Sequence, residues 1–255
     1  MKNICVSIVT ACFDSELTIA RTIESVLHQT YENVEYIIID GKSTDRTLEI
    51  VENYKPLFGE RMKVISEPDQ GIYDAMNKGI LHASGDLIGI LNSDDYYETD
   101  TVENIVSAMQ KDKYQILYGM MRILNNGIET KITMPKHENL RNEMIAHPTC
   151  FVTKDVYEDF GMFDTKYRSC ADHDFMLRMS EHKDIHFVPV YKILATFTEG
   201  TGMSSKGSSM MEAFGMLKEH GIISEKEYRS ISLSYHLKKI LKFGKNQGGL
   251  LNVSF

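Results

Sequence analysis

Two adjacent carboxylates, Asp94 and Asp95, follow an apolar run in the stretch GDLIGILNSDDYYETD. The run, residues 87–91, is typical of a short buried strand, so both acids are expected where that strand ends. Two such charges about 4 Å apart repel by roughly 4 kcal/mol at an effective dielectric constant near 20. Either a cation offsets this repulsion, or the two side chains cap the helix predicted near residues 99–109.

Three further acids, Asp14, Asp40 and Asp69, also follow strand-like runs, namely ICVSIV, VEYIIID and KVIS. Helical patterns separate these runs, and this alternation predicts a parallel sheet with helices on both faces. Ligands of such sheets bind at the carboxyl ends of the strands. A single Asp there can be a turn residue, but acids after four strands predict a site.

The turn after the first strand, TACFDSE, contains no glycine. A dinucleotide-binding site needs a glycine-rich turn at this position, so the sequence excludes such a site. A divalent metal held by carboxylates is the simplest remaining means of binding a diphosphate, and Mg²⁺ and Mn²⁺ prefer oxygen ligands. Such an ion would also relieve the repulsion between Asp94 and Asp95.

The chain has 255 residues, with Lys+Arg 28 and Asp+Glu 36, which gives a net charge of −8. This balance argues against nucleic acid as a partner. The four cysteines form no CxxC pair and predict buried free thiols, as in a reducing cytosol. Neither a signal-peptide pattern nor an apolar run of membrane-spanning length is present, so we expect a cytoplasmic protein.

The expected helices cover residues 17–29, 44–53, 71–82 and 99–109, and another follows Ala171. Ala20, Ile23 and Leu27 should form the buried stripe of the first helix, and Thr44 should cap the second. In the third, Ile72, Ala75, Met76, Gly79 and Ile80 share one face. Two strands are expected at residues 115–119 and 128–134, around the turn Asn125-Asn126-Gly127. A further strand should begin in HPTCFV, and another should lie around Pro189.

These elements predict an α/β domain over residues 1–220, made of two halves, 1–98 and 99–220. A helical, basic tail follows over residues 221–255. Its apolar positions are Leu233, Leu237, Ile240 and Leu241, and its lysines are Lys238, Lys239, Lys242 and Lys245. Such a helix can lie on an anionic membrane surface or pack on the catalytic domain with its lysines solvated.

Three segments resemble family 2 glycosyltransferases of the GT-A fold, a mostly parallel sheet flanked by helices. The first runs from VSIVTACFDSE to DGKSTDRTLEIV, the second is SEPDQGIYDAMNKGILHASGDLIGILNSDD, and the third is HPTCFV with GMFDTKYRSCADHDFMLRM. They occur in the family's order from Val6 to Met179, about two-thirds of the chain. The second ends in the family's DXD-type metal motif.

The resemblance implies that residues 1–98 form a nucleotide-binding half and residues 99–220 an acceptor-side half, and it implies a role for each matching residue. Thr10, Ala11, Cys12 and Phe13 would lie along the nucleotide. Asp40 would accept a hydrogen bond from the base or simply form a turn, and Asp69 would contact nucleotide or sugar or likewise form a turn. Asp94 would contact the ribose or the metal, and Asp95 the metal.

The resemblance also makes Asp172 the general base that deprotonates the acceptor hydroxyl, with inversion at the anomeric carbon. Its alternative role is to cap the helix that it opens. Asp174 is expected to face away from Asp172, solvated or paired with Arg178 at i, i+4. His147 would lie near donor and acceptor or be a satisfied residue at a turn. Lys206, in the glycine- and serine-rich loop 200–209, would face the diphosphate.

Two departures from the family pattern are Asn92, where many relatives have Asp, and Ala171, where Glu is common. The resemblance implies a bacterial, metal-dependent enzyme of surface polysaccharide biosynthesis, of hexosyl- or N-acetylhexosaminyl-transferase type, with Mn²⁺ or Mg²⁺. The donor would be a UDP-, GDP- or dTDP-sugar, and the acceptor a saccharide or lipid-linked saccharide at the inner face of the cell membrane. The alternatives are a sugar nucleotidyltransferase, which normally needs a basic, glycine-rich first loop, and a non-catalytic nucleotide-sugar-binding protein.

Overall fold

The computed structural model describes residues 4–199 and 208–247, with side chains for residues 4–199 and 210–236. The chain divides into two compact units, Met1–Ser205 and Lys206–Phe255. The second unit holds α7 (Ser208–Glu219) and α8 (Glu225–Gln247), so α7 groups with the predicted tail and the division falls before residue 220. None of the helices in the described ranges is both long and apolar enough to cross a membrane.

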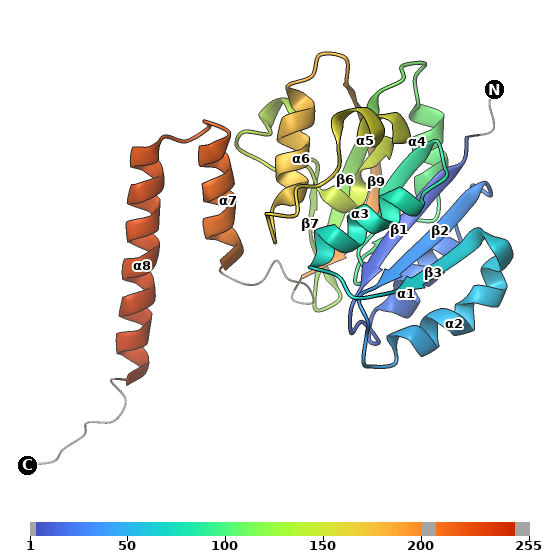
Figure 1. Ribbon diagram of the computed structural model, residues 1–255, viewed down its shortest axis with the longest axis horizontal. Helices are drawn as coiled ribbons and strands as arrows, with labels where there is room; N and C mark the ends of the chain where they lie inside the picture. Colours follow the sequence, from blue (N-terminus) through green and yellow to red (C-terminus); the bar gives the residue numbers. More distant parts are fainter. Residues whose placement is uncertain (1–3, 200–207, 248–255) are drawn as a thin grey trace, which may run out of the picture. The chain divides into compact units, whose positions relative to one another are not determined.

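The first half of the sheet is parallel, as predicted (Figure 1). Its strands, in spatial order, are β3 (Met62–Ser66), β2 (Val34–Asp40), β1 (Val6–Cys12) and β4 (Leu87–Ile90). Cys12 pairs with Asp40, and Asp40 with Ser66, so β1, β2 and β3 end level with one another. The loops that leave these strands therefore lie along one edge.

The second half makes the sheet mixed rather than mostly parallel. Here β8 (Phe151–Thr153) runs antiparallel to β4, and β6 (Gln115–Asn125) antiparallel to β8. Next comes β9 (His186–Thr198), parallel to β6, and then β5 (Tyr96–Tyr97), antiparallel to β9. The hairpin of β6 and β7 (Ile128–Thr133) turns at Asn126 and Gly127, whose φ values of 50° and 78° fit the predicted tight turn.

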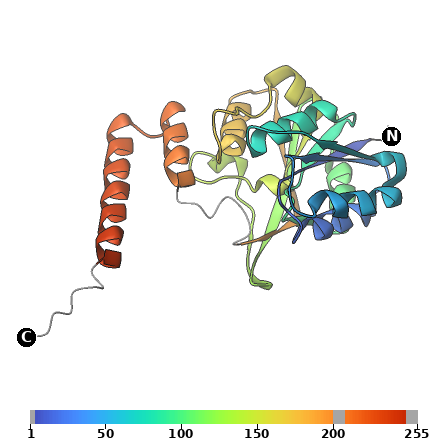
Figure 2. The same cartoon turned by 60° about the horizontal axis from the view of Figure 1, so that its bottom comes forward.

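Helices cover both faces of the sheet. The core on one face includes residues of α1 (Ile19–Leu27), α2 (Thr47–Phe58) and α4 (Thr101–Ala108). Figures 1 and 2 show α3 (Ile72–His82) on the face opposite α1 and α2. Gly79 seats α3 there, because a Cβ at this position would overlap the side chain of Val9 in β1.

An aromatic cluster joins α3 to helices α5 (Lys154–Phe160) and α6 (Ala171–Ser180) of the second half. The ring of Phe163, in the loop between α5 and α6, lies 5.6 Å from that of Tyr73 and 5.3 Å from that of Phe175, centroid to centroid. Tyr157 of α5 stacks on Phe175 at 5.2 Å. The two halves of the domain are thus packed together through α3.

Two predicted helix details were wrong. The buried stripe of α1 consists of Ile19, Thr22, Ile23 and Val26, not Ala20, Ile23 and Leu27. Thr44 does not cap α2, which begins at Thr47 and ends at Phe58. The carboxylate of Asp45 accepts the Thr47 backbone N–H at 2.9 Å, whereas the Thr44 hydroxyl donates to Asp14.

Candidate active site

The acidic segment after β4 places its two carboxylates in different environments. Asp94 is half-buried, whereas Asp95 is fully buried. One oxygen of Asp95, Oδ2, accepts the Asn92 side-chain amide at 3.1 Å. The other, Oδ1, receives no hydrogen bond from the described residues, and neither does the buried Oδ1 of Asn92. Burial, and then the charge of Asp94, raises the pKa of Asp95 well above the usual range.

Helix α1 holds this segment from one side. The Thr22 hydroxyl donates to the Asp95 carbonyl oxygen at 2.7 Å. The Arg21 guanidinium donates to the Asp94 carbonyl oxygen at 2.8 Å and to the Thr198 hydroxyl at 3.1 Å, while lying over the Tyr96 ring. Arg21 also acts to lower the pKa of Asp95. Arg21 is therefore a fixed cation beside the acidic pair, where the sequence predicted only a metal ion as the source of positive charge.

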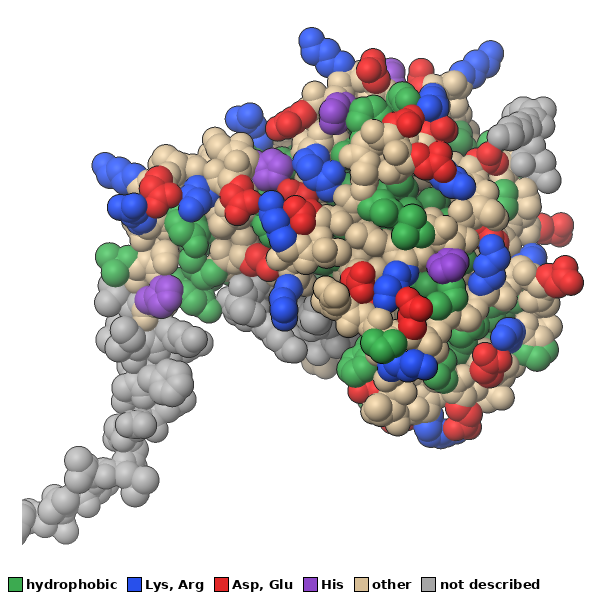
Figure 3. Space-filling view, in the orientation of Figure 1, with side chains coloured by type: hydrophobic (Ala, Val, Ile, Leu, Met, Phe, Trp, Pro, Cys, Tyr) green, Lys and Arg blue, Asp and Glu red, His purple; other side chains and the backbone are tan. Residues whose placement is uncertain are grey.

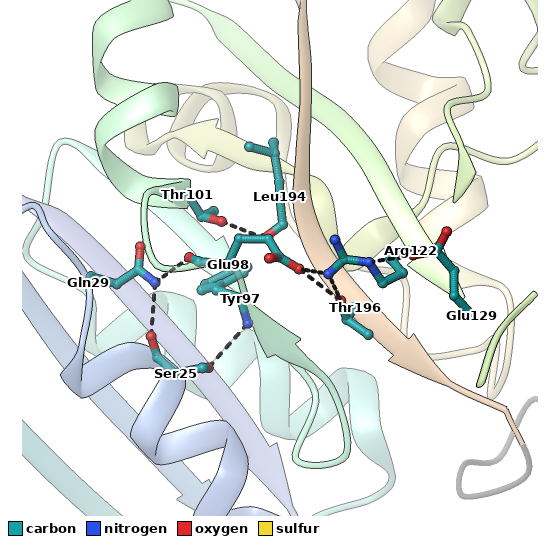
Figure 4. A network of polar contacts seen from close by, with 9 residues as sticks. All are labelled: Ser25, Gln29, Tyr97, Glu98, Thr101, Arg122, Glu129, Leu194 and Thr196. Carbon is teal, nitrogen blue, oxygen red and sulfur yellow. Dashed lines mark hydrogen bonds and ion pairs between the residues drawn. The ribbon is translucent and has the colours of Figure 1, made fainter. Parts of the chain in front are cut away.

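Figure 4 shows how the chain after Asp95 is anchored. The Tyr97 backbone N–H donates to the Ser25 hydroxyl at 3.2 Å, and the Gln29 side-chain amide donates to the Glu98 carbonyl oxygen at 2.7 Å. Further along, Arg122 of β6 donates to the Glu98 carboxylate, to Thr196 of β9 and to Glu129 of β7. Helix α1 and three strands thus fix the segment that carries the acids.

The structure places most of the predicted nucleotide-binding residues of β1 and β2 in the interior. Asp40 is fully buried, and its carboxylate accepts the Ser66 hydroxyl at 2.6 Å and the Ser43 backbone N–H at 3.1 Å. Thr10 is fully buried and accepts the Tyr36 hydroxyl at 3.1 Å. Ala11 and Cys12 are buried too, and burial raises the pKa of the Cys12 thiol.

Phe13, Gly41 and Asp69 lie together beyond these strand ends. A Cβ on Gly41 would overlap the Asp69 carboxylate and would lie 3.4 Å from the Phe13 ring. Phe13 is 60% exposed, so its ring offers an apolar surface at this edge. The other oxygen of Asp69, Oδ1, accepts the Gly71 backbone N–H at 2.9 Å, so the carboxylate is held at the start of α3.

The acids along this edge do not gather into one cluster. Asp14 accepts the Thr44 backbone N–H at 2.7 Å, and Asp40 and Asp69 have the donors described above. Over the part of the chain that the structure describes, three or more His, Cys, Asp or Glu side chains nowhere come together as a metal site. Asp14, Asp40 and Asp69 are therefore each held by separate, local hydrogen bonds.

Asp172 lies in the first turn of α6 and is 9% exposed. Its Oδ1 accepts the Tyr73 hydroxyl at 2.8 Å and the His173 backbone N–H at 3.0 Å. The N-cap of α6 is Cys170, so Asp172 is not the helix cap. Asp174 pairs with Arg178 at 2.8 Å as expected, although it is buried rather than solvated.

His147 lies in a buried turn before β8. Burial lowers the pKa of His147, and the charge of Asp172 opposes that shift, so the two side chains are electrostatic neighbours. Lys206 and most of its loop lie outside the described residues. The side chains of the tail positions Leu237, Ile240, Leu241, Lys238, Lys239, Lys242 and Lys245 are likewise not described.

Tyr73, Arg21 and Gly41 are the site residues that sequence reasoning missed. A signal for Tyr73 was present, because Tyr73, Met76 and Ile80 are buried at i, i+3 and i+7, whereas Ile72 is only half-buried. Arg21 carried no such signal, since an exposed arginine on a helix is usually a solvated residue.

Oxygen atoms near Asp94 suit a divalent ion. The two buried oxygens without partners, on Asn92 and Asp95, belong to the ligand class that Mg²⁺ and Mn²⁺ prefer. Such ions need only one or two protein carboxylates when substrate phosphates supply the remaining ligands. The residues present therefore fit an ion that binds together with a diphosphate rather than alone.

Residues 7–170 match the sequence model described as Glycosyl transferase family 2, which ends two residues before Asp172. The chain is 32% identical over 227 residues to an uncharacterized glycosyltransferase of Mycobacterium tuberculosis, covering 85% of this chain and 82% of the relative. It is 27% identical over 201 residues to a PGL/p-HBAD biosynthesis glycosyltransferase of Mycobacterium bovis, covering 78% of each.

Two solved structures share the fold. S. aureus TarS in complex with UDP-GlcNAc has a TM-score of 0.68 at 19% identity, covering 89% of this chain and 69% of TarS 1–349. The mannosyltransferase PcManGT from Pyrobaculum calidifontis, in complex with GDP-Man and Mn²⁺, has a TM-score of 0.61 at 14% identity, covering 84% and 62%. Together with the family match, these similarities show that the chain belongs to glycosyl transferase family 2 and has the GT-A fold.

Proposed function

We propose that this glycosyltransferase moves a sugar from a nucleoside diphosphate sugar to a saccharide hydroxyl, with inversion at the anomeric carbon. The observation that carries the proposal is the carboxylate of Asp172, held by Tyr73 on one oxygen at the junction of the two halves. UDP-GlcNAc and GDP-Man, bound by the two structural neighbours, indicate the class of donor.

The nucleobase binds against Phe13 and beside Asp69. Asp40 serves this site indirectly, because its carboxylate is already used by Ser43 and Ser66. A carboxylate accepts hydrogen bonds, so Asp69 suits a base edge with an imide or amine N–H, such as uracil, thymine or guanine. Gly41 leaves the room that this arrangement needs.

Asp94 would hold Mn²⁺ or Mg²⁺ together with the diphosphate, because it is the more exposed of the two acids. When bound, the ion supplies positive charge against the charge that the departing diphosphate gains. Asn92 and Asp95, which are hydrogen-bonded to each other, support the segment that carries Asp94. Arg21 keeps the backbone of Asp94 in place through its carbonyl oxygen.

Asp172 accepts the proton of the acceptor hydroxyl while that oxygen attacks the anomeric carbon. The new bond joins the acceptor oxygen to that carbon, and the bond that breaks joins the carbon to the diphosphate oxygen. The electron pair of the broken bond leaves with the nucleoside diphosphate. One carboxylate on the acceptor side is sufficient for this direct displacement.

Release of nucleoside diphosphate tests the proposal, with Mn²⁺, a panel of UDP-, GDP- and dTDP-sugars, and a panel of saccharide acceptors. The wild type is compared with Asp172→Asn and with Asp184→Asn, an exposed carboxylate beyond α6. We expect acceptor-dependent release that Asp172→Asn abolishes and Asp184→Asn leaves unchanged. Equal rates in wild type and Asp172→Asn would refute the assigned base, and pyrophosphate release from nucleoside triphosphates would favour a nucleotidyltransferase.

The acceptor is a saccharide that can be carried on a lipid, and the C-terminal unit holds the protein at the membrane surface. Support for this comes from the 23 residues of α8 and from Leu233, which is 64% exposed. Co-sedimentation with phosphatidylglycerol vesicles tests it. The proposal fails if a chain shortened after residue 223 binds these vesicles as well as the full chain does.

A further inference from the structure

One hydrogen bond connects the donor and acceptor halves at the proposed base. Tyr73 lies in the first turn of α3, and Asp172 in the first turn of α6, 99 residues further along. The hydroxyl of Tyr73 donates to Oδ1 of Asp172 at 2.8 Å, and both residues are buried. Burial, and then the charge of Asp172, raises the pKa of Tyr73, so that its hydroxyl keeps its proton and acts as the donor.

The two oxygens of Asp172 have different surroundings. Oδ1 takes both hydrogen bonds found at this carboxylate, from the Tyr73 hydroxyl and from the His173 backbone N–H. Oδ2 receives none from the described residues, so it is the oxygen able to meet an acceptor hydroxyl. We propose that Tyr73 is a positioning residue, which fixes Oδ1 and thereby orients Oδ2 as the atom that receives the acceptor proton.

The position of Tyr73 also links Asp172 to the proposed nucleotide site. Tyr73 is two residues from Gly71, whose backbone N–H is held by Asp69, the proposed nucleobase contact. The start of helix α3 is therefore tied to the proposed nucleobase contact, Asp69, and the first turn of the same helix carries the Tyr73 hydroxyl that orients Asp172. A shift of this helix would move both, so the position of Oδ2 depends on the element that binds the donor.

The other ionisable groups around Asp172 do not replace this contact. His147 and Cys150, from the segment before β8, are its electrostatic neighbours, and burial lowers the pKa of His147 and raises that of Cys150. Both are therefore neutral near pH 7. Among the described residues, the carboxylate of Asp172 is therefore held by the hydrogen bonds from Tyr73 and His173 rather than by either of these side chains.

Carbon-13 NMR of the aspartate carboxyl groups tests the proposal in the full-length protein and needs no substrate. The Asp172 signal is assigned by its absence from Asp172→Asn. In Tyr73→Phe the ionised carboxylate loses a donor, so we expect its titration midpoint to rise by about one pH unit. Tyr157→Phe is the matched control, because it removes the hydroxyl of another buried tyrosine, whose ring stacks on Phe175 of α6. The hydrogen bonds of Asp172 come from Tyr73 and His173, so the Asp172 midpoint should stay unchanged in this variant.

Kinetics with the donor and acceptor found in the panel provide the second readout. The inference rests on the proposed base, so Asp172→Asn is measured alongside. In Tyr73→Phe we expect kcat to fall about tenfold, KM for the donor to stay constant, and the acid limb of the pH profile to move upward. An unchanged midpoint and pH profile in Tyr73→Phe, while Asp172→Asn is inactive, would overturn the role of Tyr73 and leave the proposed function standing.

Discussion

Glu35 and Asp95 are both buried carboxylates, and they lie at opposite edges of the same sheet. Glu35 is near the start of β2, where it accepts the hydroxyls of Ser7 and Ser84, the backbone N–H groups of Ser84 and Gly85, and the Lys63 ammonium. Asp95 follows the end of β4 and accepts one side-chain amide. One carboxylate has all the partners that it can use, and the other has an oxygen with none.

The difference separates a structural edge from a functional edge. Burial alone would raise the pKa of Glu35, but its hydrogen bonds, that of Ser7 first, lower it to about 2. Burial, and then the charge of Asp94, does raise the pKa of Asp95, because the Asn92 amide, the charge of Arg21 and the Thr198 backbone do not compensate for it. The N-terminal edge is therefore stabilised by its own residues, whereas the C-terminal edge keeps polar atoms that a ligand can use.

The largest effect expected at the functional edge is on activity. Asp94→Asn should lower the transfer rate about a thousandfold, because it removes the carboxylate that is proposed to hold the metal ion with the diphosphate. The free energy of unfolding should change by less than about 0.5 kcal/mol, since Asp94 is half-buried and its backbone contact remains. Transfer assays and urea denaturation measure the two quantities.

The same variant has a binding readout. UDP with Mn²⁺ should raise the melting temperature of the wild type and of Asp184→Asn, but not that of Asp94→Asn. A rise of equal size in all three proteins would show that Asp94 does not hold the ion.

The largest effect expected at the structural edge is on stability. Glu35→Gln should lower the free energy of unfolding at pH 7 by roughly 3 kcal/mol, which corresponds to the change in pKa from 4.5 to about 2. Because the folded-state pKa is depressed, this stabilisation is present above about pH 4.5 and is lost as the pH falls toward 2. Denaturant unfolding from pH 7 downward should show the two proteins converging, and a constant difference would contradict the cause.

A smaller effect of opposite sign is expected for Asp95→Asn. Its raised folded-state pKa means that the ionised side chain costs stability near neutral pH, and that this cost fades as the pH falls toward 3.8. The ion-free variant should therefore be about 1–2 kcal/mol more stable than the wild type at pH 7. Thermal melts in EDTA at several pH values measure this, and a destabilised variant would refute the contrast with Glu35.

The smallest effect is expected for Ser84→Ala, which removes one of the donors to Glu35 and leaves the backbone N–H groups in place. The loss should be about 1 kcal/mol. Because Glu35 keeps its other donors, nucleotide binding should not change. Denaturant unfolding together with calorimetric titration of UDP and Mn²⁺ checks both statements.

Much of the fold could be predicted from local patterns. Alternating strands and helices indicated the parallel half-sheet, and the turn at Asn126 was predicted from the preference of Asn-Gly for positive φ. The antiparallel order of β8, β6 and β5 could not be predicted in this way, because pairing between distant strands leaves no periodic signal. The stripe of α1 was displaced because Leu17, counted into the helix, is 93% exposed.

The candidate site was predictable by residue type but not by environment. Asp40 and Asp69 were both predicted as binding residues. The structure distinguishes them, because the Asp40 carboxylate accepts the Ser66 hydroxyl in the interior, whereas the Asp69 carboxylate lies next to Gly41 at the strand ends. Tyr73 and Asp172, and likewise Arg21 and Thr198, meet only when the chain is folded. The repulsion between Asp94 and Asp95 was predicted from the sequence, but the part that Arg21 takes in offsetting it was not.

The close contact of Gly79 with Val9 limits how this enzyme can diverge. Any side chain at residue 79 would overlap Val9 and lift α3 from the sheet. Under the roles proposed for Asp69 and Tyr73, this single change would disturb the binding of both substrates. New specificities would then have to arise in the surrounding loops, while this helix remains unchanged as a common reference for the two binding sites.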